Sequence, residues 1–154
     1  MDSSKNKPAE LASLLPLIEE RLASGHSVTF SPCGVSMLPM LREGRDTVTL
    51  SPLPDRLKKH DLPLYRRENG QFVLHRIVRV GKTYRCIGDN QFLYEDGVTH
   101  GQMIAVVSAF TRDGRVIPVT SLGYRLYCRI WHLSRPCRRL WCSGAARLRA
   151  LFAK

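Results

Sequence analysis

The chain has 154 residues, 44% of them hydrophobic, so it is long enough for one compact domain with a core and too short for two full domains. Its best uncharged apolar run, Ile104–Phe110, is far shorter than the roughly 18 residues that a membrane-spanning helix needs, so we expect no span. The formal net charge of +11 is uneven, because residues 121–154 hold eight basic residues and no acid. We therefore expect a negatively charged partner to bind residues 121–154.

The N-terminus does not resemble a secretory signal, because Pro16, Glu19, Glu20 and Arg21 interrupt its leucines, and we expect a cytoplasmic chain. The five cysteines are an odd number, without a CxxC pair and without a histidine at metal-ligand spacing. We therefore expect reduced thiols, no metal and no cofactor.

The first expected element is an amphipathic helix over Pro8–Ser24. Its leucines and isoleucine recur at intervals of three and four residues, and Gly25 provides a stop signal. This helix defines an N-terminal segment, residues 1–26.

Residues 27–120 change to short segments rich in β-branched and aromatic residues, separated by turn signals such as Asn69-Gly70. Because both turn residues tolerate positive φ, this turn should hold the strand that carries His75 antiparallel to its neighbour. A mostly β domain is expected. The predicted strands are Val28–Ser31, Asp46–Leu50, Leu62–Arg66, Phe72–Val80, Tyr84–Ile87, Ile104–Phe110 and Val116–Val119.

Residues 121–154 return to a helical pattern, with a break at Pro136, and interleave arginines with aromatic and apolar residues. Three interpretations remain open: a helix packed on the β domain, a helix lying on an anionic membrane surface, and a dock for an acidic leader peptide or partner protein. No nucleic-acid recognition motif is visible, so no specific nucleic acid is expected.

The segment Gly34–Asp46 (GVSMLPMLREGRD) holds the first candidate for chemistry, Ser36. A serine on a turn preceded by Gly34 can expose its hydroxyl and leave its N–H free, providing a nucleophile and an oxyanion donor. Met37 and Pro39 would shape the turn and a substrate groove. The structural alternative is a turn serine beside a packing methionine.

A serine hydroxyl needs a neighbouring base, and His75 in Phe72–Val80 is the candidate. Strand alternation places Val73, His75, Ile77 and Arg79 on one face. The alternative is a hydrogen-bonded structural histidine. Two further segments follow, Ile87–Asn90 (IGDN) and Gln102–Val107.

Taken in order, the SMxP, HRI and GDN boxes and the closing strand resemble the signal peptidase I and LexA superfamily of serine peptidases, over Val28–Phe110. The HRI box resembles the archaeal and endoplasmic-reticulum branch, whose base is a histidine. The resemblance implies a LexA-like β domain over residues 27–120 and a Ser36/His75 dyad that cleaves a leader or signal-like segment of a precursor. Asp89 of the GDN box would stabilise the site or orient its groups.

Either Asp89 or Asp96 could orient His75, and Glu95 lies next to Asp96 in the sequence. We favour Asp96, although Asp96-Gly97 is also typical of a solvent-exposed turn. The chain departs from the pattern at Gly34, where some relatives carry a serine that donates to the oxyanion, and at Arg45, which interrupts a Gly-Asp pair. Relatives also have membrane anchors. Peripheral contact with the inner membrane through residues 121–154 would substitute for one.

Three rival functions remain: a silent peptide-binding module, a self-processing LexA-like regulator, and a membrane-surface adaptor.

Overall fold

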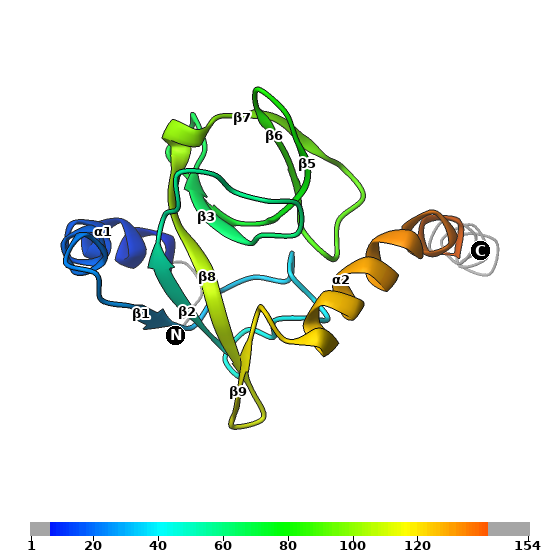
Figure 1. Cartoon of the computed structure of the whole chain (residues 1–154), viewed down its shortest axis with the longest axis horizontal. Coiled ribbons are helices and arrows are strands. Elements are labelled where there is room, and N and C mark those ends of the chain that lie inside the picture. The colour runs from blue at the N-terminus through cyan, green and yellow to red at the C-terminus, as the bar shows by residue number, and fades with distance from the viewer. Residues whose placement is uncertain (1–6, 142–154) are drawn as a thin grey trace, which may run out of the picture.

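The structure is a computed structural model that describes residues 7–141, with only the backbone for residues 7–12. It is mainly β, with antiparallel sheets and helices at both ends (Figure 1). The helices are α1 (Lys7–Ala23), the 3-10 helix η1 (His100–Gln102) and α2 (Leu122–Leu133). The strands are β1 (Val28–Phe30), β2 (Thr47–Pro52), β3 (Pro63–Arg66), β4 (Phe72–Leu74), β5 (Arg76–Val80), β6 (Tyr84–Ile87), β7 (Glu95–Val98), β8 (Met103–Arg112) and β9 (Arg115–Pro118).

Two sheets share the β region. The larger has the strand order β1-β2-β8-β3-β4, with β9 paired to β8, and the smaller has the order β5-β6-β7. The turn at Asn69-Gly70 joins β3 and β4 as an antiparallel pair, as the sequence predicted, and Gly70 has a φ of 84°. The sheet topology therefore fixes where one sheet passes into the other, between β4 and β5.

The predicted strand Phe72–Val80 is interrupted at His75. Residues before it pair with β3 in the larger sheet, and residues after it pair with β6 in the smaller one. His75 therefore lies at the junction of the two sheets. Asp96 and Gly97, for which an exposed turn was the alternative interpretation, are exposed but belong to β7, which pairs with β6.

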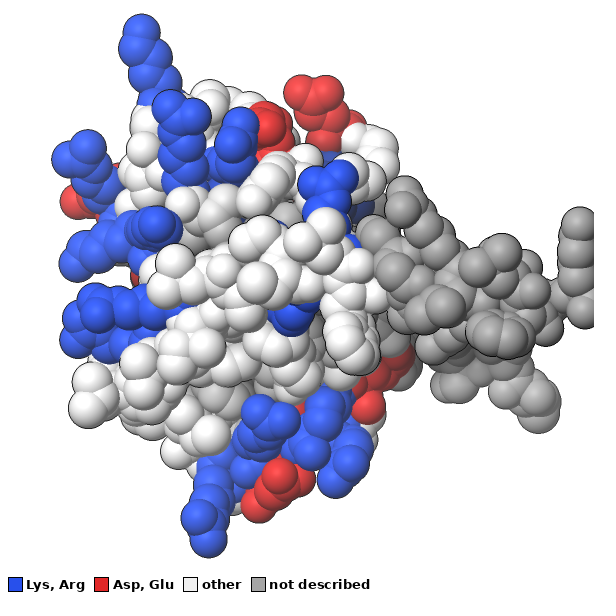
Figure 2. Space-filling model, turned by 90° about the vertical axis from the view of Figure 1, so that its right-hand side faces the viewer, with Lys and Arg blue, Asp and Glu red and all other residues white. Residues whose placement is uncertain are grey.

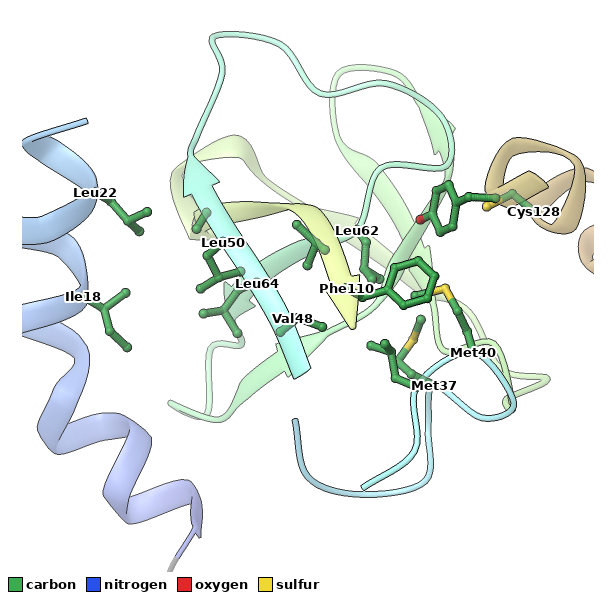
Figure 3. Packing of buried hydrophobic residues seen from close by; sticks show 14 residues of the cluster. Ile18, Leu22, Met37, Met40, Val48, Leu50, Leu62, Leu64, Phe110 and Cys128 are labelled. Carbon is green, nitrogen blue, oxygen red and sulfur yellow. The ribbon is translucent and has the colours of Figure 1, made fainter. Parts of the chain in front are cut away.

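Two clusters of buried side chains form the core. The first joins α1, β2, β3 and β8 to the Ser36 loop and α2, through residues that include Ile18, Met37, Phe110 and Tyr124 (Figure 3). The second lies between the two sheets and includes Tyr65 and Cys86, neither of which has solvent exposure. The Ser36 loop and His75 thus sit against well-packed structure.

The C-terminal tail begins with α2, which lies on the opposite side of the sheets from α1 (Figure 1). Ser121 caps the helix by accepting a hydrogen bond from Tyr124 N–H, and Tyr124 and Cys128 are buried. The helix ends at Leu133, and residues 135–141 are again helical, with Pro136 in the first turn. In the described part of the chain, no helix combines the length and apolarity needed to cross a bilayer.

Candidate functional site

Ser36 lies in the loop between β1 and β2, and its side chain is partly exposed. The loop is anchored on the C-terminal side of Ser36 by buried residues, Met37, Met40 and Leu41. Farther along, the buried carboxylate of Asp46 accepts a hydrogen bond from Arg42 N–H at 2.9 Å and forms an ion pair with the same residue's guanidinium. A loop anchored in this way holds Ser36 in a defined position.

The GDN segment holds the backbone of Ser36 directly. Asn90 N–H donates to the carbonyl oxygen of Ser36 at 2.8 Å, and the Asn90 side-chain amide donates to the carbonyl of Val35 at 3.2 Å. Gly88 lies against the same carbonyl, so closely that a β-carbon on Gly88 would be 2.6 Å from the Ser36 oxygen. The Ser36 loop therefore fills the space that a side chain at position 88 would need.

The β5–β6 ladder relates this space to His75. The ladder ends at the pair Arg76 and Ile87, so His75 immediately precedes this pair on one strand and Gly88 immediately follows it on the other. The Ser36 carbonyl that packs on Gly88 and the residue His75 are therefore attached to the same end of the β5–β6 pair.

His75 is only 1% exposed and is held by an acid that we did not favour from the sequence. Its Nδ1 lies 2.9 Å from Oε1 of Glu95. Glu95 in turn accepts hydrogen bonds from the hydroxyl of Tyr65 at 2.8 Å and from Nε of Arg67 at 2.9 Å. Glu95 thus orients the ring of His75, and Tyr65 and Arg67 orient Glu95.

The electrostatics favour a neutral imidazole that can accept a proton. Burial lowers the pKa of His75 below its usual 6.5, and the Glu95 carboxylate opposes part of this shift. Burial alone would raise the pKa of Glu95, but hydrogen bonds from Arg67 and Tyr65 lower it below 4.5. Because an ionised Glu95 can only accept hydrogen bonds, Nδ1 of His75 must be the protonated nitrogen, which leaves the lone pair on Nε2.

Nε2 of His75, the nitrogen that carries the lone pair, belongs to a residue that is only 1% exposed. Within the described part of the chain no hydrogen bond joins this nitrogen to Ser36, whose backbone carbonyl accepts a hydrogen bond from Asn90. Catalytic hydrogen bonds are often long without substrate and shorten when it binds.

Asp89 does not contact His75. It forms an ion pair with Arg76 in which both side chains are fully buried, with contacts of 2.8 and 2.7 Å. The same guanidinium donates to the hydroxyl of Tyr124 at 2.6 Å and lies 2.8 Å from the sulfur of Met40. Asp89 and Arg76 therefore join the GDN segment, the Ser36 loop and α2 into one unit.

α2 reaches this unit through aromatic residues. The hydroxyl of Tyr127 donates to the Asp89 carboxylate at 3.1 Å, and the indole N–H of Trp131 donates to the Asp89 carbonyl at 2.8 Å. Nη2 of Arg135 contacts the carbonyl of Gly88 at 3.4 Å. One face of α2 and of the turn after it is thus packed on the β region, as the first of the three interpretations required, while residues 142–154 of the basic tail lie outside the described residues.

Asp96, which we favoured for orienting His75, forms an ion pair with Arg85 on the surface instead. Its side chain is 60% exposed and is not in contact with His75. The assignment of the orienting acid therefore moves by one residue, to Glu95. The cause is an irregular register between β6 and β7, where Tyr84 pairs with Val98 but Cys86 pairs with Glu95.

Gly34, Met37 and Pro39 were expected to shape the oxyanion and substrate site, and the structure places each of them in a different environment. Gly34 has a φ of 87° and its N–H donates to Glu43 at 3.0 Å, so it is not free to bind an oxyanion. Met37 is buried in the first core cluster rather than lining a groove. Pro39 is exposed, follows a cis peptide bond, and its carbonyl accepts a hydrogen bond from Arg112.

The described residues contain no group of three or more His, Cys, Asp or Glu side chains that could hold a metal ion. Cys33 and Cys137 are exposed free thiols and Cys86 and Cys128 are buried ones, while Cys142 lies outside the described residues.

Comparison of the chain with models of protein families, with curated proteins and with solved structures found no match.

Proposed function

We propose that this chain is a serine endopeptidase of the signal-peptidase and LexA type, with Ser36 as nucleophile, His75 as general base and Glu95 as the positioning residue of His75. The observation that carries the proposal is that the Ser36 carbonyl packs against Gly88, at the end of the β5–β6 ladder where His75 immediately precedes β5, while Nδ1 of His75 lies 2.9 Å from Glu95.

The proposed reaction begins when Oγ of Ser36 attacks a peptide carbonyl carbon and its proton passes to Nε2 of His75. The negative charge on the carbonyl oxygen is stabilised by the N–H of Ser36 and a neighbouring amide. The carbon–nitrogen bond then breaks as His75 returns the proton to the leaving amine. Water, deprotonated by His75, hydrolyses the acyl-enzyme and regenerates Ser36.

Glu95 has a defined part in this scheme. By accepting a hydrogen bond from Nδ1–H, it keeps the lone pair on Nε2 and stabilises the imidazolium that forms when His75 takes the proton. Burial keeps the pKa of His75 below 6.5, so the ring is in its basic form near neutral pH. The proposed substrate is a leader or signal-like segment of a peptide or protein precursor.

The test is covalent labelling of the full chain with a fluorophosphonate probe, alongside cleavage of a diverse peptide library followed by mass spectrometry. Wild type should be labelled and should cleave, while Ser36→Ala should do neither and His75→Ala should be strongly impaired. Equal inertness of all three proteins toward probe and library supports the silent peptide-binding module. Two fragments of the purified wild type, absent from Ser36→Ala, support self-processing.

A specific observation also supports contact with an anionic membrane. The face of α2 that points away from the β region exposes a stripe of apolar side chains, each between 54% and 80% exposed: Leu122, Leu126, Ile130 and Leu133. Exposed arginines at positions 125 and 129 flank this stripe, and Figure 2 shows uncharged surface surrounded by Lys and Arg side chains on this side of the molecule. A helix of this kind binds the interface between headgroups and acyl chains.

A further inference from the structure

A pocket of about 490 Å³ is lined by residues of the small sheet, of the connection between β6 and β7, and of the C-terminal end of α2 and the turn after it, and its lining includes neither Ser36 nor His75. Its size is within the range of about 300–1,000 Å³ that ligand pockets occupy. Its lining contains five cationic side chains, one histidine and two aromatic rings, and no carboxylate: Lys59, Val78, Arg79, Arg85, Phe92, Tyr94, His132, Arg135, Pro136 and Arg139. Arg85 is ion-paired with Asp96, which lies outside the lining, so the lining and this carboxylate together keep an excess of positive charge that suits an anion.

Two of these arginines are positioned by the wall of the pocket. The guanidinium of Arg85 lies 5.2 Å from the centre of the Tyr94 ring, and that of Arg135 lies 5.5 Å from it. Such stacking restricts two long side chains that would otherwise move freely in solvent. These side chains then lose less conformational entropy when a bound anion orders them.

Arg135 is the most buried of the five. It is only 7% exposed, its Nε has no hydrogen-bond partner, and no described carboxylate forms an ion pair with it, although its Nη2 contacts the carbonyl of Gly88. A buried charge without a counter-ion is costly, and a bound anion would reduce this cost. His132 adds little charge at neutral pH, because burial lowers its pKa to about 4.

The position of the pocket indicates which anion it would take. Phe92 and Tyr94 belong to the connection that begins at Gly88, holds Ser36 through Asn90, and ends at Glu95. A peptide bound here would have its neighbouring residues close to Ser36. The cationic side chains are spread around the pocket, from Lys59 to Arg139. Such a spread suits the several carboxylates of an acidic peptide better than a single compact anion.

We propose that this basic pocket is an exosite that binds an acidic segment of the peptide substrate, a proposal that rests on the peptidase function above. The segment would be rich in Asp and Glu and would lie outside the bond that is cleaved. Binding it would raise the local concentration of the cleavage site at Ser36.

The experiment uses fluorescence anisotropy of a fluorescein-labelled oligoglutamate with the full-length chain, as wild type and as Ser36→Ala. Both should bind equally, because the pocket is separate from the nucleophile. Changing Lys59→Glu together with Arg79→Glu should weaken binding at least about tenfold, since both side chains line the pocket. The matched control, Arg21→Glu with Arg115→Glu, makes the same change in net charge at exposed positions away from the pocket and should bind like wild type.

Equal weakening by both pairs of substitutions would overturn the exosite in favour of diffuse charge attraction. So would displacement of oligoglutamate by inorganic tripolyphosphate at far lower concentrations than unlabelled oligoglutamate, which would identify a phosphate site. Fluorophosphonate labelling of the same variants separates this proposal from the peptidase function. Labelling without oligoglutamate binding removes the exosite alone, whereas binding without labelling leaves an acid-binding pocket and removes its role in proteolysis.

Discussion

The carbonyl oxygen of Ser36 lies 2.6 Å from the place where a β-carbon on Gly88 would be. Because real β-carbons are not found at that distance from another atom, glycine is the residue that lets the Ser36 loop approach the smaller sheet. The same contact attaches the Ser36 loop to the end of the β5–β6 ladder, at the pair Arg76 and Ile87 that His75 and Gly88 flank.

Gly88→Ala should therefore reduce activity more than it reduces stability. The added methyl group pushes on the Ser36 carbonyl and on the side chain of Gln91, which lies 2.9 Å from the same position. Overpacking of this kind costs about 1–3 kcal/mol of unfolding free energy, and a displacement of about 1 Å at a nucleophile can cost about 100-fold in rate. The measurements are thermal unfolding and the rate of fluorophosphonate labelling. Gly101→Ala is the control, because a β-carbon there meets nothing within 4 Å; equal labelling rates for the two variants would contradict this account.

Glu95→Gln and Asp96→Asn distinguish the two neighbouring acids. Only Glu95 contacts His75, so Glu95→Gln should lower kcat/KM for a cleaved peptide by about 100- to 10,000-fold, as loss of the orienting carboxylate does in serine peptidases. Asp96→Asn removes a surface ion pair with Arg85 and should leave kcat/KM close to wild type. The comparison is steady-state kinetics on one peptide. A larger effect at Asp96 would restore the assignment made from the sequence.

The pH dependence of kcat/KM should have an acid limb with a midpoint below 6.5. His75 acts as a base only when neutral, and burial lowers its pKa, so activity persists to lower pH than an exposed histidine would allow. The Glu95 carboxylate raises the pKa of His75, so residual activity of Glu95→Gln should show a limb at still lower pH. A limb above 6.5 in the wild type would mean that His75 is more solvated or more strongly paired than this structure has it.

The ion pair of Arg76 and Asp89 should be essential for stability. Breaking it by Asp89→Asn leaves a fully buried guanidinium without its counter-ion, which costs about 3–5 kcal/mol of unfolding free energy. Replacing both partners with apolar residues should cost less than removing one. Urea unfolding of Asp89→Asn, Arg76→Met and the double variant tests this, and the exposed pair Arg85 and Asp96 provides the control, for which little change is expected.

The exposed stripe of α2 should bind vesicles that contain anionic lipid. A fully buried aliphatic side chain contributes roughly 1.5 kcal/mol or more, so Leu126→Ser with Ile130→Ser should lower partitioning onto phosphatidylserine vesicles at least about tenfold. Val116→Ser removes an exposed apolar side chain from β9 and should have no effect. Cosedimentation with vesicles measures both. Equal partitioning of all the proteins would argue that another molecule covers the stripe.

Sequence pattern predicted the mainly β architecture, the helices at both ends and the turn at Asn69-Gly70, because hydrophobic period and turn chemistry are local properties. It did not reveal that the strand through His75 passes between two sheets. Alternation continues across that point, with Val73, His75 and Ile77 all buried, so the sequence gives no sign of the break.

The missed acid has a similar cause. In a regular ladder from the pair Tyr84 and Val98, the residue opposite Cys86 would be Asp96, and that residue would face the core. The irregular register brings in Glu95 instead, and a one-residue shift of a strand reverses which side chains point inward. Tyr65 and Arg67, which hold Glu95, come from a distant strand and the residue that follows it, and only the pairing of the strands brings them to the site.

The attachment of α2 has a mechanical consequence. Tyr127 and Trp131 bind Asp89, a single peptide bond connects Asp89 to Asn90, and Asn90 holds the carbonyl of Ser36. The position of α2 and the position of the Ser36 backbone are thus coupled through two adjacent residues, Asp89 and Asn90, with no flexible linker between them.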